Sequence, residues 1–331
     1  MLTIVIITII IALLFDFLNG MNDAANSIAT IVSTKVLSPL MAVAWAAFFN
    51  FAAVFFFGVK VATTIGKGIV DPGIINEYVI LGGLLGAVIW VFTCTRLGMP
   101  ISVSHALIGG LMGPALMVGG TSAILSAGIT KVLLFIVLSP LIGLVLSYFI
   151  MIITMLVFRN AHPRKVDKLF RIMQLLSSAV FSLGHGSNDA QKTMGIIAIL
   201  LFSTGYLGSE FYVPTWVIFT SYGMIALGTL AGGRKVIKTL GSGLTHLKPV
   251  QGFSAEAAGA LTLIGSAVAG IPVSTTHTIT GSIMGVGLTK RVSSIRWGVA
   301  GNIIIAWIFT IPGTMLMSAG IYWIISLFLT T

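Results

Sequence analysis

The residues of this chain that can do chemistry are acidic and amide side chains that interrupt long apolar stretches. The first group is the segment NGMNDAAN, residues 19–26, with Asp16 ahead of it. Counted from Asp16, acidic and amide residues recur at spacings of 3, 4 and 3, which places them on one face of a helix. An unpaired carboxylate is costly inside a lipid bilayer. A polar stripe through such sequence therefore indicates a path for a solute or an ion.

A second copy of this pattern, the segment HGSNDAQK at residues 185–192, follows 166 residues later. Carboxylates and side-chain carbonyls are hard oxygen donors that can replace the hydration shell of sodium, and an aspartate can carry a proton instead. The competing interpretation is a pair of internally capped Asx turns, which gives no reason for two buried carboxylates. The candidates for coupling a cation or a proton are therefore Asn22, Asp23, Asn26, Asn188 and Asp189.

A second pair of motifs points to an anion. The segment GMPISVSH at residues 98–105 aligns without gaps with GIPVSTTH at residues 270–277. A proline ahead of a helix, with hydroxyl groups and free amides at the positive end of the helix dipole, makes a cradle for an anion. Two such cradles facing each other can hold a small oxyanion. The expected substrate contacts are Ser102, Ser104, His105, Ser274, Thr275, Thr276 and His277.

Two alternatives stay open at these helix starts. The hydroxyl groups can bond back to their own helix instead of to a ligand. The two histidines, His105 and His277, can serve either a structural hydrogen bond beside the site or a direct proton relay.

One position breaks the symmetry of the two Asn-Asp motifs. Asn26 in the first motif is matched by Lys192 in the second. An ammonium group has only donors, so we expect Lys192 to neutralise Asp189 and to compete with sodium for that place. We also expect Lys192 to reach the bound anion, and we include Gln191 beside it among the substrate-binding residues. The alternative is that Lys192 turns away into a water-filled vestibule.

The composition identifies the class of protein in which these motifs occur. Only 8% of the 331 residues are charged and 57% are apolar, with a mean hydropathy of +1.09. Soluble domains lack this composition, and the apolar runs are continuous, so we expect an all-α polytopic membrane protein and not a β-barrel. The single cysteine, Cys94, excludes an intramolecular disulfide. The net charge of +10 comes mainly from loops, where the positive-inside rule explains it without a nucleic-acid partner.

Apolar segments divide the chain into two similar halves joined by a basic linker. The first half, residues 1–158, contains expected spans at 2–34, 39–57, 78–97, 100–118 and 123–158. The linker, residues 159–171, carries five basic residues. The second half, residues 172–331, contains expected spans at 172–207, 214–232, 254–270, 272–288 and a final region broken at Pro312. A further break is expected near residues 19–23. Pro140 makes the 123–158 segment either one kinked span or two short ones.

An odd number of crossings per half inverts one half relative to the other. With five crossings per half and both termini outside, fourteen of the 18 Lys and Arg residues fall on the cytoplasmic side. Inverted repeats with broken or re-entrant helices are a common design of secondary transporters, so we expect two such repeats with about 10–12 transmembrane helices. Whether segments 100–118 and 272–288 cross fully or re-enter stays open.

Four motifs resemble those of the PiT family of inorganic phosphate transporters, in the same order and over nearly the whole chain. They are GMNDAANS at 20–27, GSNDA at 186–190, RKVIKTLG at 234–241 and GIPVSTTH at 270–277. The resemblance implies a helical bundle, usually dimeric, that symports phosphate with sodium or protons. It places Asp23 and Asp189 at the family's essential aspartates and the anion at the two serine and threonine turns. Glu256 matches an acidic position of the sodium-coupled members, which adds it to the coupling candidates.

Two departures from that pattern resemble the bacterial low-affinity branch of the family. Asn50 stands where the sodium-coupled members carry a second glutamate, and Gln191-Lys192 follows the second Asn-Asp pair. That branch is often proton-coupled and carries metal–phosphate complexes. We therefore expect a homodimeric importer of inorganic phosphate or metal-phosphate in the inner membrane, coupled to protons or sodium. No cofactor besides the coupling ion is expected.

Other functions compete with this interpretation. A sulfate permease on the same scaffold is the runner-up, although both Asn-Asp motifs are intact here. An intramembrane phosphohydrolase could use His105 or His277 as nucleophile, but no cluster of basic residues accompanies these histidines at the membrane surface. A passive anion channel would be lined by basic rings and not by carboxylates. We therefore expect a transporter and not an enzyme.

Overall fold

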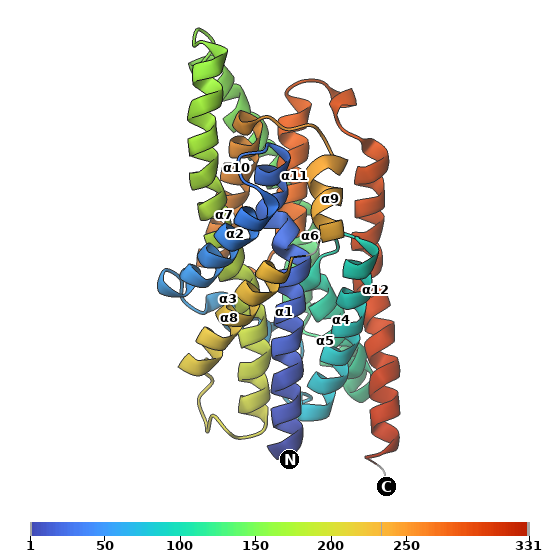
Figure 1. Cartoon of the computed structure of the whole chain (residues 1–331). Coiled ribbons are helices and arrows are strands. Elements are labelled where there is room, and N and C mark those ends of the chain that lie inside the picture. The colour runs from blue at the N-terminus through green and yellow to red at the C-terminus, as the bar shows by residue number, and fades with distance from the viewer. Residues whose placement is uncertain (1, 233, 330–331) are drawn as a thin grey trace.

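The computed structural model describes residues 2–232 and 234–329, and over these residues the fold is built from α-helices (Figure 1). The first half contains α1 (Leu2–Ser33), α2 (Pro39–Ala52), α3 (Lys60–Gly68), α4 (Glu77–Leu97), α5 (Val103–Gly119) and α6 (Ser126–Val157). The second half contains α7 (Pro163–Ser203), α8 (Thr215–Ala231), α9 (Arg234–Gly243), α10 (Pro249–Val268), α11 (Thr275–Leu288) and α12 (Trp297–Leu327). The expected all-α class is confirmed.

Several of these helices are long and apolar enough to cross a membrane. Five meet both conditions, namely α1, α4, α5, α6 and α12, and the bent pair of α2 and α3 makes a sixth if it crosses as one span. The 41-residue α7 is more polar because it begins with the charged segment 163–171 and also carries the second Asn-Asp motif. Large apolar side chains such as Phe55, Leu156 and Leu316 are exposed, as contact with lipid requires. The chain is therefore a multi-pass membrane protein.

The breaks expected inside the long apolar segments do not occur. α1 continues without interruption through residues 19–26, and α12 continues through Pro312. In α1, the side chains of Asn22 and Asn26 donate to other helices instead of competing for their own backbone. In α12, the proline is tolerated because neighbouring groups in a membrane bundle compensate for one lost backbone hydrogen bond. Pro140 lies inside α6, which is a single helix, so of the two alternatives for this segment one span is observed.

The second expected span ends earlier than the apolar sequence suggests. α2 stops at Ala52, and after a short turn the chain bends by 84° into α3. The segment from Lys60, expected to be a loop, therefore begins as a helix. The first amides of α3 are capped from α7, because the Gln191 Oε1 atom accepts hydrogen bonds from Val61 N at 2.9 Å and Ala62 N at 3.3 Å. This long-range cap explains a helix start that local sequence did not indicate.

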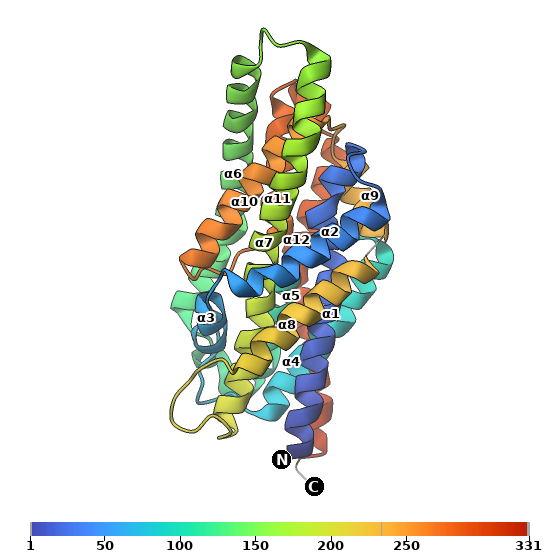
Figure 2. The same ribbon diagram turned by 60° about the vertical axis from the view of Figure 1, so that its left-hand side comes forward.

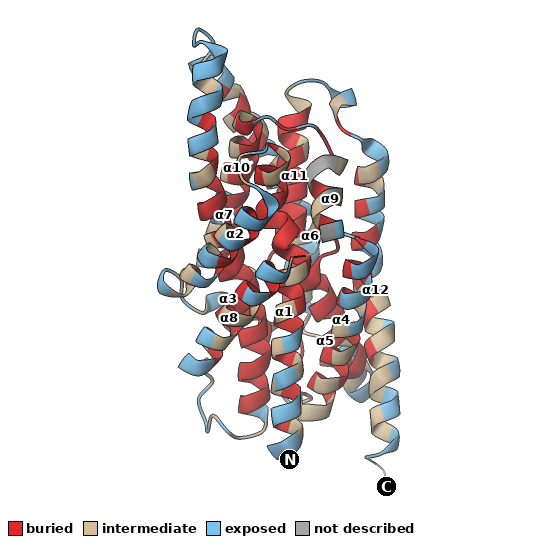
Figure 3. Cartoon of the chain, in the orientation of Figure 1, coloured by how far each residue is buried: buried red, intermediate tan, exposed pale blue. Residues whose placement is uncertain are grey.

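The two halves exchange partners in a reciprocal way. α1 packs against α8 while α7 packs against α2, and α5 packs against α12 while α11 packs against α6. α1 and α7, which carry the two Asn-Asp motifs, run in opposite directions through the middle of the molecule (Figures 1 and 2). Residues buried by this packing concentrate where these helices meet (Figure 3). The inverted repeat itself, over residues 1–158 and 172–331, stays a prediction.

The start of α1 and the end of α12 lie at the same end of the molecule, and the connection between α6 and α7 lies at the opposite end (Figure 1). α7 begins at Pro163, so most of the basic segment 159–171 is helical. The 289–296 connection lies at that same opposite end, so these two basic segments share one side (Figure 1). Their sidedness relative to the cell stays a prediction.

Candidate functional site

The two aspartates of the Asn-Asp motifs lie together at the meeting point of α1, α7 and the start of α11. They form a group that we call the central cluster, which consists of Asp23, Asp189, Lys192, Thr275 and Thr276. Each of these side chains is at most 2% exposed. Segments far apart in the sequence thus bring two carboxylates and one ammonium group into a site closed to solvent.

A threonine at the start of α11 joins the two carboxylates. Thr275 Oγ1 lies 3.0 Å from Asp23 Oδ2 and 3.1 Å from Asp189 Oδ2. A hydroxyl group has one proton, so it can donate to only one of these oxygens at a time. Thr276 Oγ1 lies 3.3 Å from Asp23 Oδ1 and 3.0 Å from Ile101 O. The start of α11 is therefore in hydrogen-bond contact with both aspartates.

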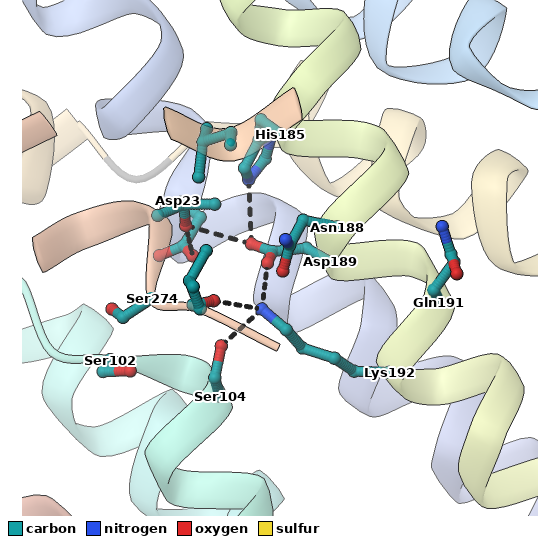
Figure 4. A network of polar contacts seen from close by, with 12 residues as sticks. Asp23, Ser102, Ser104, His185, Asn188, Asp189, Gln191, Lys192 and Ser274 are labelled. Carbon is teal, nitrogen blue, oxygen red and sulfur yellow. Dashed lines mark hydrogen bonds and ion pairs between the residues drawn. The ribbon is translucent and has the colours of Figure 1, made fainter. Parts of the chain in front are cut away.

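Lys192 links the second Asn-Asp motif to both helix starts. Its Nζ atom forms an ion pair with Asp189 Oδ1 and donates to Ser104 Oγ at 2.6 Å and to Val273 O at 2.9 Å (Figure 4). These contacts, together with its 1% exposure, exclude the interpretation in which Lys192 turns into a vestibule. The ammonium group is held between one carboxylate and the segments expected to hold an anion.

Asp23 differs from Asp189 in its partners. Asp189 has Lys192 and also His185, whose Nε2 atom lies 3.2 Å from Asp189 Oδ2. Among the described residues, Asp23 forms no ion pair with a lysine or an arginine, and its hydrogen bonds come from the two threonines. The first carboxylate therefore lacks the built-in cation that the second one has.

The asparagine side chains of both motifs each leave one oxygen without a partner. Asn22 Nδ2 donates to Thr95 Oγ1 at 2.7 Å, Asn26 Nδ2 to Thr276 Oγ1 at 3.0 Å, and Asn188 Nδ2 to Ser266 Oγ at 3.3 Å. Their Oδ1 atoms are buried and have no hydrogen-bond partner among the described residues. Carbonyl oxygens of this kind are ligands for a hard cation, so the residues fit the coupling role expected of them.

The serines that open α5 and α11 are helix N-caps. Ser102 Oγ accepts from His105 N, and Ser274 Oγ accepts from His277 N, each at 3.3 Å. Of the two alternatives for the hydroxyl groups, bonding to their own helix therefore holds for these two serines. The first amides of each helix, those of residues 103–104 and 275–276, still lack an intrahelical acceptor and can receive an anion.

The two helix starts meet through their histidines. The rings of His105 and His277 pack edge to face with centroids 4.7 Å apart, and Trp307 stacks on His277 at 3.6 Å. His277 Nδ1 lies 3.2 Å from Ile136 O, and Trp307 Nε1 donates to Pro100 O at 3.2 Å. Among the described residues, neither histidine ring hydrogen-bonds to a carboxylate of the central cluster. These contacts favour the structural role over the direct proton relay.

Two expected site residues lie away from the central cluster. The side chain of Gln191 points away from Lys192 and caps α3, so it does not join the anion contacts (Figure 4). Glu256 on α10 is buried in a separate group, where it accepts from Thr30 Oγ1 at 2.6 Å, from Gln174 Nε2 at 3.0 Å and from Ser177. Gln191 therefore serves as a helix cap, whereas the coupling role expected of Glu256 stays a prediction.

His185 is a member of the site that sequence reasoning gave no role. Thr229 Oγ1 donates to Ile225 O at 2.8 Å, so it can only accept from Asn50 Nδ2, which lies at 2.9 Å. Asn50 Oδ1 then accepts from His185 Nδ1 at 3.0 Å. This chain of bonds fixes the tautomer and directs the Nε2 atom of His185 at Asp189. The sequence feature that could have identified His185 as a site residue is its spacing of four residues from Asp189, which places both on one helical face.

With its tautomer fixed in this way, the neutral imidazole would present a lone pair to a carboxylate. A cation between the two atoms would be bound by both of them. The ligand atoms of Asp23, His185 and Asp189 lie within 4.8 Å of one another, so the three side chains can surround a single ion. The nitrogen ligand suits a transition metal better than sodium, which prefers oxygen.

Comparison with known proteins gives consistent matches along the chain. The family described as the phosphate transporter family matches residues 19–165 and 157–318. A protein of Rhizobium meliloti (strain 1021) named probable low-affinity inorganic phosphate transporter is 57% identical over 314 residues, covering 95% of this chain and 94% of that protein. A protein of the same name from Bacillus subtilis (strain 168) is 41% identical over 329 residues, covering 99% and 98%. The solved structure of a sodium-dependent phosphate transporter matches with a TM-score of 0.91 at 27% identity, covering 98% of this chain and 99% of that one.

Proposed function

Because the chain belongs to the phosphate transporter family, we propose that it imports inorganic phosphate by proton-coupled symport, with Lys192 in place of a second coupling cation. The family consists of transporters, so the chain is not an enzyme and the phosphohydrolase interpretation is not retained. The relatives described above are named for phosphate, and the sulfate interpretation is not retained either.

The buried contact between Lys192 and Asp189 carries this proposal. The Lys192 ammonium group neutralises the carboxylate of Asp189. This positive charge is part of the protein and is not a transported ion. A sodium ion beside Asp189 would have to displace that ammonium into an apolar interior. The second half therefore supplies a fixed countercharge for phosphate, next to Ser104 and the start of α11.

The coupling follows from the charge left on the first half. Phosphate bound at the two helix starts would lie close to Asp23, which has no lysine or arginine partner among the described residues. Two like charges at short distance in a low dielectric repel strongly. Phosphate therefore binds well only when Asp23 carries a proton, or at most one cation held with the free oxygens of Asn22 and Asn26. Binding of one solute then requires the other, which is the condition for symport.

A metal–phosphate complex is a second form of substrate, and the position of His185 favours it. The metal of such a complex would be part of the cargo, held by Asp23, His185 and Asp189. A nitrogen ligand beside two carboxylates suits a divalent transition metal. Uptake of labelled phosphate with and without a chelator distinguishes the two forms, because only the complex loses uptake when free divalent metal is removed.

The remaining expectations are part of the same proposal. The distribution of basic residues supports an inner-membrane protein with both termini outside and the 159–171 segment in the cytoplasm. The family resemblance supports a homodimer. No cofactor beyond the coupling ion is needed, because the charges for binding phosphate come from Lys192 and the helix starts.

Transport by the purified protein in liposomes tests the proposal. We expect labelled phosphate to accumulate inside when the outside is made acidic, and excess sulfate to leave that uptake unchanged. The exposed Asp167→Asn variant, which alters only a surface ion pair with Arg171, serves as a control and should transport normally. Equal inhibition by sulfate and by unlabelled phosphate would contradict the proposed substrate.

A further inference from the structure

Asp16 is a buried carboxylate that the central cluster does not use. It is 0% exposed, and neither of its carboxylate oxygens has a hydrogen-bond partner among the described residues. It precedes Asp23 on α1 by seven residues, about two helical turns. A lone carboxylate in the interior of a membrane protein is costly and needs a reason.

Three other polar groups without partners gather around it. Asn19 on α1 and Thr193 on α7 lie beside the carboxylate, and Tyr222 on α8 is close enough to interact with its charge. Asn19 Oδ1, Thr193 Oγ1 and the Tyr222 hydroxyl are buried and have no hydrogen-bond partner among the described residues. We call Asp16, Asn19, Thr193 and Tyr222 the Asp16 group.

The chemistry of this group suits a proton. A protonated Asp16 can donate to the carbonyl of Asn19 and accept from the hydroxyls of Thr193 and Tyr222, so that every member has a partner. An ionised Asp16 can still accept from both hydroxyls, but its negative charge then has no cation within the group. The group therefore has two useful states that differ by one proton.

The charged surroundings connect this group to the central cluster. The charged or titratable groups that act on Asp16 are Asp189 and Lys192 on α7 and Tyr222 on α8. These charges act on Asp16 through an interior that contains little water to screen them. A change of charge in the central cluster therefore changes the proton affinity of Asp16.

The Asp16 group lies on one particular side of the central cluster. α1 rises from the end of the molecule that carries both termini, and α7 descends towards it (Figure 1). Asp16 precedes Asp23 on the rising helix, and Thr193 follows Asp189 on the descending one. Both therefore lie on the side of the central cluster that faces the termini.

We propose that Asp16 is a proton-carrying residue, through which the coupling proton passes between the end that bears the termini and the Asp23–Asp189 pair. The proposal rests on the proposed function, since it assigns a carrier for the proton that drives phosphate import. Asp16 takes no part in holding phosphate. Its role is to accept a proton on one side and release it to the central cluster on the other.

Substitution of Asp16 separates proton movement from phosphate binding. Asp16→Asn keeps the shape of the side chain but cannot exchange a proton. In liposomes, the variant should retain exchange of labelled for unlabelled phosphate at equal pH on both sides, and should lose uptake driven by an acid exterior. Asp16→Glu should retain both. A wild-type protein without exchange would refute the proposed function itself, and that result is distinct from failure of the Asp16 variants.

A matched control exists at the corresponding place in the second motif. Ser182 precedes Asp189 by the same seven residues and is also buried without a partner. Ser182→Ala should retain both exchange and pH-driven uptake. Normal pH-driven uptake by Asp16→Asn would overturn the proposal, and so would loss of exchange in that variant. If Asp16→Asn does not insert, the pH profile of Asp16→Glu decides, because a shifted profile supports a proton carrier and an unchanged profile overturns it.

Discussion

The ammonium group of Lys192 is paired with the carboxylate of Asp189 inside the protein, one helical turn away on α7. The matching position in the first motif is Asn26, whose amide donates to Thr275 and Thr276 and whose carbonyl oxygen is free. One half thus contains a permanent cation where the other half offers an oxygen ligand. The proposed function therefore assigns different numbers of coupling ions to the two halves.

Replacing that permanent cation should change the coupling ion. Lys192→Asn restores the residue found at the matching position of the first motif and leaves Asp189 without its ion-pair partner. We expect phosphate uptake by this variant to become dependent on sodium, because sodium can then occupy the place of the ammonium group. The measurement is the initial rate of uptake over a range of external sodium concentrations at constant pH.

A lysine outside the site provides the control for this variant. Lys290, in the connection before α12, donates to His246 O at 3.3 Å on an exposed face. Lys290→Asn should show the same response to sodium as the unchanged protein. Sodium-independent uptake by Lys192→Asn at the normal rate would show that the ammonium group does not substitute for an ion.

Neutralising either central carboxylate should abolish uptake without unfolding the protein. Asp23→Asn removes the group expected to take the coupling proton, and Asp189→Asn leaves the buried Lys192 without its counterion. Uptake by each variant is measured at equal expression, with membrane insertion verified separately. Transport at the normal rate in either variant would remove that aspartate from the mechanism.

One hydroxyl group at each helix start should contribute to the binding of phosphate. Ser104 Oγ is held by Lys192, and Thr276 lies between Asp23 and Ile101 O. We expect Ser104→Ala or Thr276→Ala to weaken apparent phosphate affinity by about 1.5–3 kcal/mol, roughly a tenfold to hundredfold rise in the half-saturation concentration. Unchanged half-saturation in both variants would place the anion elsewhere.

The helix caps provide a contrast on the same segments. Ser102 uses its hydroxyl group to cap α5, so Ser102→Ala should lower stability by about 1 kcal/mol. Its half-saturation concentration for phosphate should change less than that of Ser104→Ala. Thermal unfolding and uptake, measured on both variants, separate the capping role from the binding role.

The close contact of α1 with α8 should be sensitive to one methyl group. A Cβ atom at Gly20 would sit against the backbone of Ile225, whereas one at Gly223 on α8 would meet open space. We expect Gly20→Ala to lower the unfolding temperature in detergent, with a cost of about 1–3 kcal/mol for overpacking, and Gly223→Ala to leave it nearly unchanged. Equal unfolding temperatures for the two variants would contradict this packing.

The composition and the motif spacings were sufficient to predict the class of fold and most of the residues of the central cluster. Continuous apolar runs with few charges leave helical membrane packing as the main solution, and it is the one observed. A carboxylate buried in a membrane protein is costly unless other polar groups surround it. The two aspartate motifs were therefore expected to lie together. The pairing of Lys192 with Asp189 follows the spacing of three residues on one helix.

What the sequence did not indicate depends on contacts between distant segments. The amides of α3 are capped by Gln191 from another helix, so neither the helix nor the direction of that side chain follows from local pattern. The expected break in α1 is absent because Asn22 and Asn26 bond to other helices. The role of His185 depends on Asn50 and Thr229, which are remote in sequence and fix its tautomer only in the folded chain.

Phosphate uptake into liposomes, with the pH gradient and the sodium gradient imposed separately, tests the central claim most directly. The buried pairing of Lys192 with Asp189 predicts that an acid exterior drives accumulation in the complete absence of sodium. It also predicts that a sodium gradient at equal pH on both sides drives little or none. Accumulation that requires the sodium gradient and is indifferent to pH would contradict the account.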